Sequence, residues 1–312
     1  MNRDVKHYDS EGTAPAIERD AGTRPSPATE AASFSSTVGT SRRLDSPRRL
    51  GLAAVIWRYI PPVVIFLALI GVWELVAMFG GFPSYILPSP GNVMSAALFA
   101  DRSDLMSAAA TTVVEIVIGF GAAVTIGFLL ALSLVASKSL RRGVYPLVIA
   151  TQTIPILAIA PVMIIWFGFG ILPKILVVTL FAFFPVAINT MTGMSSVERD
   201  TIYLMQVLGC SRGHILWRVR VPASLPYFFT GVRQAAVISA IGAIAGEWVG
   251  AAKGLGPLMI GANSGMQTNV VFAAILYLSV IAIAMFSLVS VIERLSLGWY
   301  YISRDAESAG KA

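Results

Sequence analysis

Residues 171–194, ILPKILVVTLFAFFPVAINTMTGM, are the stretch of sequence that decides the fold. Its one charged residue, Lys174, lies near the start, and the rest is almost entirely apolar. About 20 mainly apolar residues are needed for a helix to cross the hydrocarbon core of a bilayer. The stretch therefore predicts a membrane-spanning helix.

The rest of the chain repeats this pattern. Apolar residues make up 56% of the 312 residues and charged residues only 13%, and the mean hydropathy is +0.74, which is outside the usual balance of a soluble domain. We therefore expect an all-α, polytopic membrane protein with about six transmembrane helices. The five further predicted spans are Pro62–Phe79, Thr111–Val135, Tyr145–Phe167, Tyr227–Gly250 and Val271–Ile292.

Basic residues between these spans predict the orientation of the chain, because they are retained on the cytoplasmic side. Loops with several basic residues alternate along the chain with loops that carry very few. The richer set is Arg48, Arg49, Arg58, Lys138, Arg141, Arg142, Arg199, Arg212, Arg218, Arg220, Arg294 and Arg304, and the poorer set is Arg102, Lys174 and Lys253. Both termini are therefore expected in the cytoplasm. The basic residues that orient the chain in the membrane account for the net charge of +6. Nucleic acid is therefore not an expected partner, whereas membrane lipid is.

Three regions follow from composition. Residues 1–50 are rich in Ser, Thr, Ala, Pro and charge, and they are expected to form a disordered cytoplasmic tail. Residues 51–303 form the predicted transmembrane domain, which includes a cytoplasmic loop over about 197–226. Residues 304–312 are expected to be a short cytoplasmic tail.

The residues needed for enzymatic chemistry are missing from the predicted spans. The chain has two histidines and one cysteine, Cys210, so neither a cysteine metal cluster nor a His-Glu-x-x-His metal helix can form. None of the spans contains aspartate, and no Gly-x-x-x-x-Gly-Lys-Ser/Thr phosphate loop occurs. We expect no catalytic or metal site. If the protein uses ATP, another chain must bind it.

Besides Lys174, which is counted with the loops because it lies at the start of its span, four ionisable residues fall inside predicted spans, where charge is costly and usually functional. Glu74 is expected at the membrane interface, and Arg233 is expected to extend to the surface through its long side chain. Glu115 fits either packing against a polar partner or lining a pathway. Glu247 is predicted to face a translocation path.

Glycines recur every four residues around Glu247. Gly242, Gly246 and Gly250 lie on one helical face, and small residues at this spacing let membrane helices approach closely. We expect them to form a helix-packing seam.

The most polar stretch between spans includes LGCSRGHILWRVRVPASLP, residues 208–226. Apolar residues recur at helical intervals on both sides of Gly209–Gly213, which predicts a helix, a turn and a short helix along the cytoplasmic surface. Pro222 and Pro226 are expected to interrupt the chain before the fifth span. A basic amphipathic loop can also anchor to the membrane surface without any protein partner.

This loop resembles the EAA motif of the permeases of bacterial ATP-binding cassette (ABC) importers. The resemblance implies a segment that docks on the ATPase, with Gly209 in its turn; the residues carried over are Leu208, Gly209, Cys210, Ser211, Arg212, Gly213, Val219 and Pro222. The positions that name the motif are occupied by Tyr203, Leu204 and Met205 in place of Glu-Ala-Ala, so the docking face is expected to differ.

Further stretches between about Trp57 and Tyr300 resemble the same permeases. YILPSPGNV (85–93), residues 153–174 and FFPVAINTMTG (183–193) are similar to the nitrate, sulfonate, taurine and thiamine-precursor branch. GEWVGAAKGLGPLM (246–259) is most similar to importers of pyrimidine or riboflavin-type heterocycles. Such a heterocycle is the favoured solute, followed by sulfonate, taurine or nitrate.

The resemblance implies partners as well. They are a pair of ATP-binding subunits that hold ATP and Mg²⁺, a periplasmic solute-binding protein and a second copy of this permease, in the bacterial inner membrane. No cofactor is expected on this chain. The alternatives are a secondary, proton-coupled transporter that uses Glu115 and Glu247, an intramembrane enzyme, and an exporter.

Overall fold

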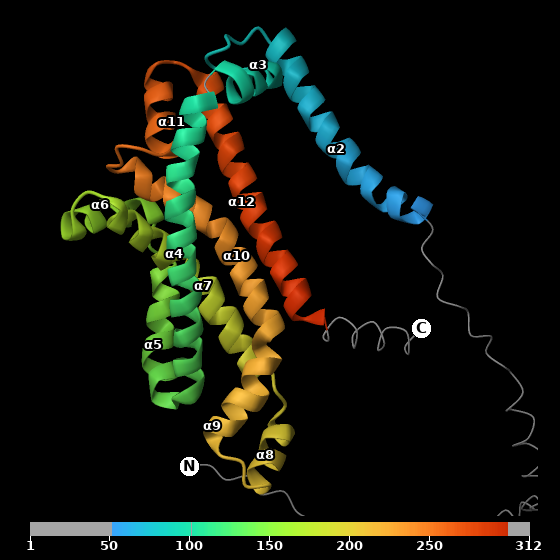
Figure 1. Cartoon of the computed structure of the whole chain (residues 1–312), viewed down its shortest axis with the longest axis vertical. Coiled ribbons are helices and arrows are strands. Elements are labelled where there is room, and N and C mark those ends of the chain that lie inside the picture. The colour runs from blue at the N-terminus through green and yellow to red at the C-terminus, as the bar shows by residue number, and fades with distance from the viewer. Residues whose placement is uncertain (1–51, 101, 299–312) are drawn as a thin grey trace, which may run out of the picture. The chain divides into compact units, whose positions relative to one another are not determined.

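The computed structural model describes residues 52–100 and 102–298, and all regular structure in these ranges is helical. The chain divides into two units, residues 1–63 and 64–312, and the second holds every feature discussed below (Figure 1). The tails predicted at residues 1–50 and 304–312 lie outside the described residues. In chain order the helices are α2 (Leu52–Phe79), α3 (Pro90–Ser95), the π-helical turn η1 (Ala96–Ala100), α4 (Arg102–Ala136), α5 (Lys138–Thr151), α6 (Ile156–Phe167), α7 (Ile171–Ser195), α8 (Arg199–Val207), α9 (Arg212–Ile215), the π-helical turn η2 (Leu216–Arg220), α10 (Val221–Trp248), α11 (Leu255–Ser264) and α12 (Thr268–Ser296).

Within the described residues, five helical stretches are long and apolar enough to cross a membrane, or six if the bent pair α5 and α6 forms one span. The prediction of an all-helical chain with about six spans is confirmed. The helix α7 begins where the sequence predicted and ends one residue later, at Ser195. The helix α4 begins nine residues earlier than expected, at Arg102.

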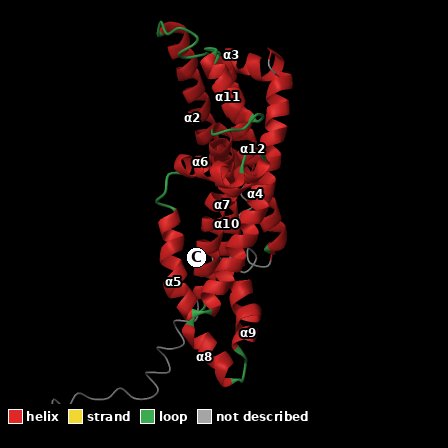
Figure 2. Ribbon diagram, turned by 90° about the vertical axis from the view of Figure 1, so that its left-hand side faces the viewer, coloured by secondary structure: helices red, strands yellow, loops and turns green. Residues whose placement is uncertain are grey.

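The predicted third span is not one straight helix. The chain breaks after Thr151 and turns by 104° between α5 and α6, so α6 leaves the bundle between its two ends (Figures 1 and 2). Pro155 explains the break, because proline has no N–H for a helical hydrogen bond and disfavours helical backbone in the preceding residue. The hydroxyl of Thr153 donates to the Ala150 carbonyl (2.8 Å) and so satisfies one acceptor at the end of α5.

The expected interruption at Pro222 and Pro226 does not occur. The chain stays helical from Arg212 through α9, η2 and α10 to Trp248. Pro222 lies in the first turn of α10, where a missing N–H costs little. Pro226 lies inside α10, and the hydroxyl of Thr230 donates to its carbonyl (3.0 Å). The wide turn η2 comes directly before both prolines, and such turns absorb local irregularity in a helix.

The helix α7 lies at the centre of the bundle, between α4 and α10. Each neighbour approaches it through glycine. A Cβ on Gly119 of α4 would lie 2.6 Å from the Val178 side chain, and one on Gly242 of α10 would lie 3.1 Å from the Val178 Cα. One on Gly231 would lie 2.5 Å from the Pro185 carbonyl oxygen. Since both helices meet α7 almost backbone to backbone, the core of the bundle is closely packed.

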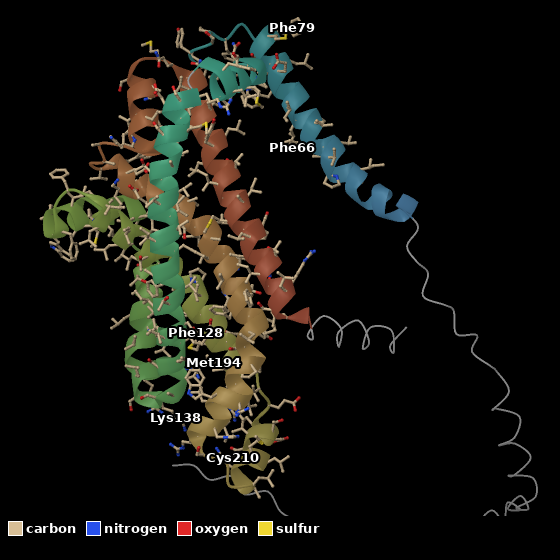
Figure 3. The ribbon with its side chains drawn as sticks, in the orientation of Figure 1. Phe66, Phe79, Phe128, Lys138, Met194 and Cys210 are labelled. Carbon is tan, nitrogen blue, oxygen red and sulfur yellow. The ribbon has the colours of Figure 1, made fainter. Side chains whose placement is uncertain are left out.

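Two opposite ends of this unit carry different elements. The helices α3 and α11 lie at one end, and α8 and α9 lie at the other (Figures 1 and 2). Lys138 and Cys210 share the second end, whereas Phe79 lies at the first (Figure 3). At the first end the Tyr277 hydroxyl donates to the Ala97 carbonyl (3.1 Å), which ties α12 to η1. The helix α11 was not predicted, because ten residues are too few to show a clear apolar period.

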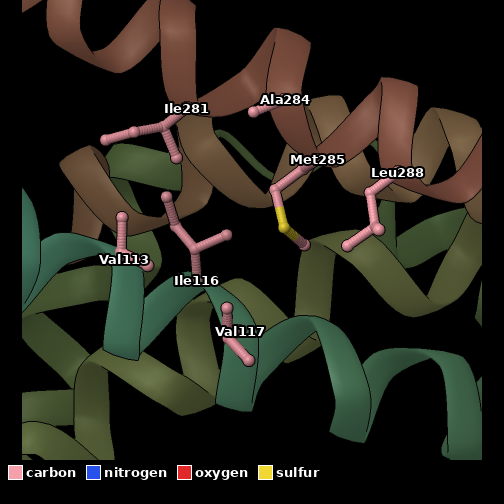
Figure 4. A pocket seen from close by; sticks show the side chains of 7 residues that line it. All are labelled: Val113, Ile116, Val117, Ile281, Ala284, Met285 and Leu288. Carbon is pink, nitrogen blue, oxygen red and sulfur yellow. The ribbon is translucent and has the colours of Figure 1, made fainter.

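An apolar pocket of about 190 Å³ lies between α4 and α12 (Figure 4). All seven side chains that line it are aliphatic or methionine, so it has no group that could orient a polar solute. The lining residues are Val113, Ile116, Val117, Ile281, Ala284, Met285 and Leu288.

Candidate functional site

The turn after α8 is closed by two hydrogen bonds that define a Schellman motif. The Cys210 N–H donates to the Met205 carbonyl and the Gly209 N–H to the Gln206 carbonyl, both at 3.0 Å. This motif places the residue after the helix cap in the left-handed region, where glycine is favoured. Gly209, at this position, has φ of +82°.

The next helix starts directly after this turn. Ser211 has extended backbone, and its hydroxyl accepts the His214 N–H (3.3 Å), which caps the start of α9. The chain therefore has a fixed end to α8 and a fixed start to α9, separated by only four residues. Such a turn can transmit the movement of α8 to α10 as one lever, because α9, η2 and α10 are continuous.

Residues 209–222 fall into an exposed group and a half-buried or buried group. The residues Gly209, Ser211, Arg212 and Gly213 are exposed. Cys210, Val219 and Pro222 are half-buried, and Ile215 is only 3% exposed. The first group is thus available to a partner, whereas the second holds the segment against the bundle.

An exposed apolar patch covers one side of α8 and its cap. Tyr203, Leu204, Val207 and Leu208 are 60%, 59%, 84% and 70% exposed. They lie in the most polar stretch between the spans, at the end of the bundle that also holds Lys138. Clustered apolar side chains outside a hydrocarbon environment usually mark an interaction surface. We call these four residues the α8 patch.

A buried hydrogen-bond network lies near the opposite end of α10. Glu247 is 1% exposed; its Oε1 accepts the Thr112 hydroxyl (2.7 Å) and its Oε2 accepts the Gly256 N–H (2.6 Å). Thr112 in turn accepts the Leu255 N–H (3.0 Å). One carboxylate thus joins α10, α4 and the start of α11.

The same corner contains an ion pair. Lys174 of α7 donates to Oε1 of Glu115 on α4. Glu115 is 0% exposed. Lys174, which the sequence placed among the loop cations, is therefore an interhelical partner inside the bundle.

Glu247 was predicted to line a translocation path, and Glu115 either to line it or to pack against a polar partner. In this conformation both carboxyl groups are covered by the chain's own helices and neither lines the pocket of Figure 4. Their contacts tie helices together, so the role of either residue in a path stays a prediction.

Two of the three glycines for which a packing seam was expected, Gly242 and Gly246, lie against α7. A Cβ on Gly246 would lie 3.3 Å from the Lys174 Cα, so Gly246, like Gly242, faces α7. Gly250 follows the end of α10 and faces Ile164 and Phe169. This seam holds Lys174 close to the α10 backbone.

Arg233 forms an ion pair within the bundle, while its side chain stays 30% exposed. Its Nη1 lies 3.0 Å from Oε2 of Glu293, which joins α10 to α12. The sequence did not indicate this pair, because Glu293 lies one residue beyond the predicted end of the sixth span. The signal that could have found it is the presence of opposite charges near the same end of two neighbouring spans.

One protein family, described as the binding-protein-dependent transport system inner membrane component, matches residues 123–296. The formylaminopyrimidine transport permease protein ThiX of Halalkalibacterium halodurans is 35% identical over 243 residues, which cover 78% of this chain and 97% of that protein. The riboflavin transport system permease protein RibX of Chloroflexus aurantiacus is 32% identical over 255 residues, covering 81% and 95%. The taurine transport system permease protein TauC of Escherichia coli is 33% identical over 220 residues, covering 69% and 80%.

Proposed function

Because the chain belongs to the family of binding-protein-dependent transport permeases, it is a multi-pass permease subunit of an ABC importer, and we propose that its α8–α9 segment is where the ATPase docks. The permease is not itself an enzyme, and ATP is bound by the partner ATPase. Membership of this family argues against the three alternative functions, which were a proton-coupled carrier, an intramembrane enzyme and an exporter.

The α8 patch is the observation that carries the docking proposal. Four large apolar side chains, three of them on the last turns of α8, are exposed beside a turn that is held by capping hydrogen bonds. A groove on the ATPase that accepts them would bury apolar area worth about 25 cal/mol per Å². Exposed Arg212 and Arg218 would meet acidic residues at the rim of that groove. Movement of the ATPase would then pass through α9 and η2 into α10.

The orientation follows from the same proposal. The ATPase is cytoplasmic, so the α8–α9 end of the bundle faces the cytoplasm, in agreement with the positive charge of the loops at that end. If the bent pair α5 and α6 counts as one span, the six spans place both termini in the cytoplasm. The solute-binding protein docks on the opposite, periplasmic end, where α3 and α11 lie.

A second copy of this chain is proposed as the other half of the channel. The broken backbone between α5 and α6 and the loop at Gly168–Gly170 lie between the two ends of the bundle. Irregular backbone within a membrane is tolerated where protein or a water-filled path covers it, not lipid. Ile165, Trp166 and Phe169 beside this backbone are 79%, 69% and 80% exposed, which fits cover by a second subunit. Co-isolation of two differently tagged copies tests this proposal.

For the solute we propose a neutral or weakly charged heterocycle of the pyrimidine or flavin-precursor type. The relatives named for formylaminopyrimidine and riboflavin transport match more of this chain than the one named for taurine transport. Sulfonate, taurine and nitrate are the next candidates.

Uptake measurements test this solute proposal. We expect cells that carry the importer to accumulate a labelled formylaminopyrimidine or riboflavin at least about ten-fold faster than cells in which the permease gene is deleted. Complementation with the intact gene restores the rate. Uptake of taurine or an alkanesulfonate that depends on the permease, with no effect on the heterocycles, would contradict the proposal.

A further inference from the structure

Three ionisable side chains meet in the interior where α4, α7 and α10 cross. Glu115, Lys174 and Glu247 come from one helix each; the two glutamates are 0% and 1% exposed and the lysine side chain is 11% exposed. The helix α11 also reaches this corner, through Gly256, and residues 255–264 contain no ionisable group. With every group ionised, one positive and two negative charges would leave a net charge of −1 in the interior.

The donors in this cluster are not shared equally between the two carboxyl groups. Both oxygens of Glu247 accept a hydrogen bond, from Thr112 and from the Gly256 N–H. Glu115 accepts from Lys174 on Oε1, but its Oε2 is buried without a hydrogen-bond donor among the described residues. The two carboxyl groups share this corner: Thr112, three residues before Glu115 on α4, donates to Glu247, and Lys174, which pairs with Glu115, packs against Gly246 beside Glu247. A hydrogen bond between the two carboxyl groups needs a proton, which two ionised carboxylates lack.

We propose that Glu115 Oε2 carries a proton and donates it to the Glu247 carboxylate. The bare oxygen then becomes a donor, and the cluster becomes neutral with one ammonium, one carboxylate and one carboxylic acid. Burying an uncompensated charge is strongly unfavourable, whereas a paired and hydrogen-bonded set is tolerated. The proton belongs on Glu115 because the two donors that face Glu247 stabilise its ionised form.

The proposed proton makes the stability of the folded chain depend on pH. Glutamate exposed in the unfolded chain is ionised at neutral pH, so the folded chain binds one proton more than the unfolded chain. Stability therefore falls as pH rises, because the folded state must release that proton. Glu115, Lys174 and Glu247 are the charged groups in the cluster. The inference goes beyond the importer assignment, since it involves neither ATPase nor solute.

Glutamine variants distinguish the protonated carboxyl group from the ionised one. In Glu115→Gln the amide nitrogen can donate to Glu247 while the amide oxygen accepts from Lys174, which reproduces the proposed pattern without a titratable proton. In Glu247→Gln an amide N–H must face either the Thr112 hydroxyl or the Gly256 N–H, both of which donate to this side chain. The matched control is Glu74→Gln, the same change outside the cluster.

The experiment measures the thermal unfolding midpoint of the purified full-length permease in detergent between pH 5 and pH 8. We expect the wild type and Glu74→Gln to lose stability in parallel as pH rises across this range. Glu115→Gln should stay within about 2 °C of the wild type at pH 7 and lose this pH dependence. Glu247→Gln should unfold roughly 5–10 °C lower at pH 7.

Three outcomes would overturn the proposal. The first is a loss of stability in Glu115→Gln at pH 7 as large as that in Glu247→Gln. The second is a pH profile that is the same in Glu115→Gln and the wild type. The third is stabilisation of the wild type by sodium at fixed pH that Glu115→Gln abolishes, since a metal cation would then satisfy Oε2. None of these readouts depends on transport, so they are independent of the ATPase-docking proposal.

Discussion

Replacing Gly209 with valine is expected to uncouple ATP hydrolysis from transport. Gly209 has φ of +82°, a conformation that costs an L-residue about 1–2 kcal/mol and a β-branched residue more. The cost falls on the turn that joins the α8 patch to α9, so the turn opens and the lever loses its fixed geometry. In proteoliposomes with the ATPase and the binding protein, we expect solute imported per ATP hydrolysed to fall roughly ten-fold or more.

The control uses the same position. A Cβ on Gly209 would meet no atom within 4 Å, so the effect comes from backbone conformation and not from a clash. Asparagine tolerates left-handed backbone better than other non-glycine residues, and Gly209→Asn should keep most of the coupling. Equal loss in both variants would show that side-chain bulk matters, and wild-type coupling in Gly209→Val would remove the turn from the mechanism.

Replacing Gly231 with alanine is expected to lower the stability of the bundle strongly, because it forces α10 away from α7. Its new Cβ would lie 2.5 Å from the Pro185 carbonyl oxygen and 3.0 Å from the Val186 Cα. Both are backbone atoms, so relief requires α10 to move away from α7. Overpacking of this kind costs about 1–3 kcal/mol. We expect a lower thermal midpoint in detergent and reduced yield of folded protein.

Gly121→Ala is the matched control for this change. Gly121 lies inside α4, and a Cβ there would meet no atom within 4 Å. Alanine is intrinsically more favourable than glycine in a helix by up to about 1 kcal/mol, so this variant should be neutral or more stable. If both alanine variants behave alike, close approach of α10 to α7 is not what Gly231 provides.

The fold could be predicted well from sequence because membrane spans have a strong local signal. The helix α7 was predicted to within one residue at its end, and the glycine spacing around Gly246 indicated the helical face that meets α7. The bend after Thr151 was missed, since three prolines in an apolar run permit either a kinked span or two helices. The continuation of the helix through Pro222 was also missed, because a π-helical turn leaves no recognisable sequence pattern.

The parts of the site that depend on local sequence could be predicted, and the long-range contacts could not. The positive φ of Gly209 follows from its position after a helix, and it could be expected. The contact of Glu247 with Thr112 joins residues 135 positions apart, and no pattern in a single sequence indicates such a pairing. Lys174 was assigned to a loop because a charge near the start of a span is usually interfacial. Arg233 was expected at the surface for the same reason.

Site-specific photocrosslinking tests the central claim, that the α8 patch contacts the ATPase. A photoreactive amino acid replaces Leu208, which is 70% exposed, in tagged permease expressed with its native partners, and crosslinked products are identified by mass spectrometry. The same substitution at Ile283, 65% exposed on α12, is the control. We predict a crosslink to a phosphate-loop ATPase from position 208 and none from position 283. Crosslinks from position 208 to lipid alone, while the ATPase co-purifies with the permease, would contradict docking at the α8 patch.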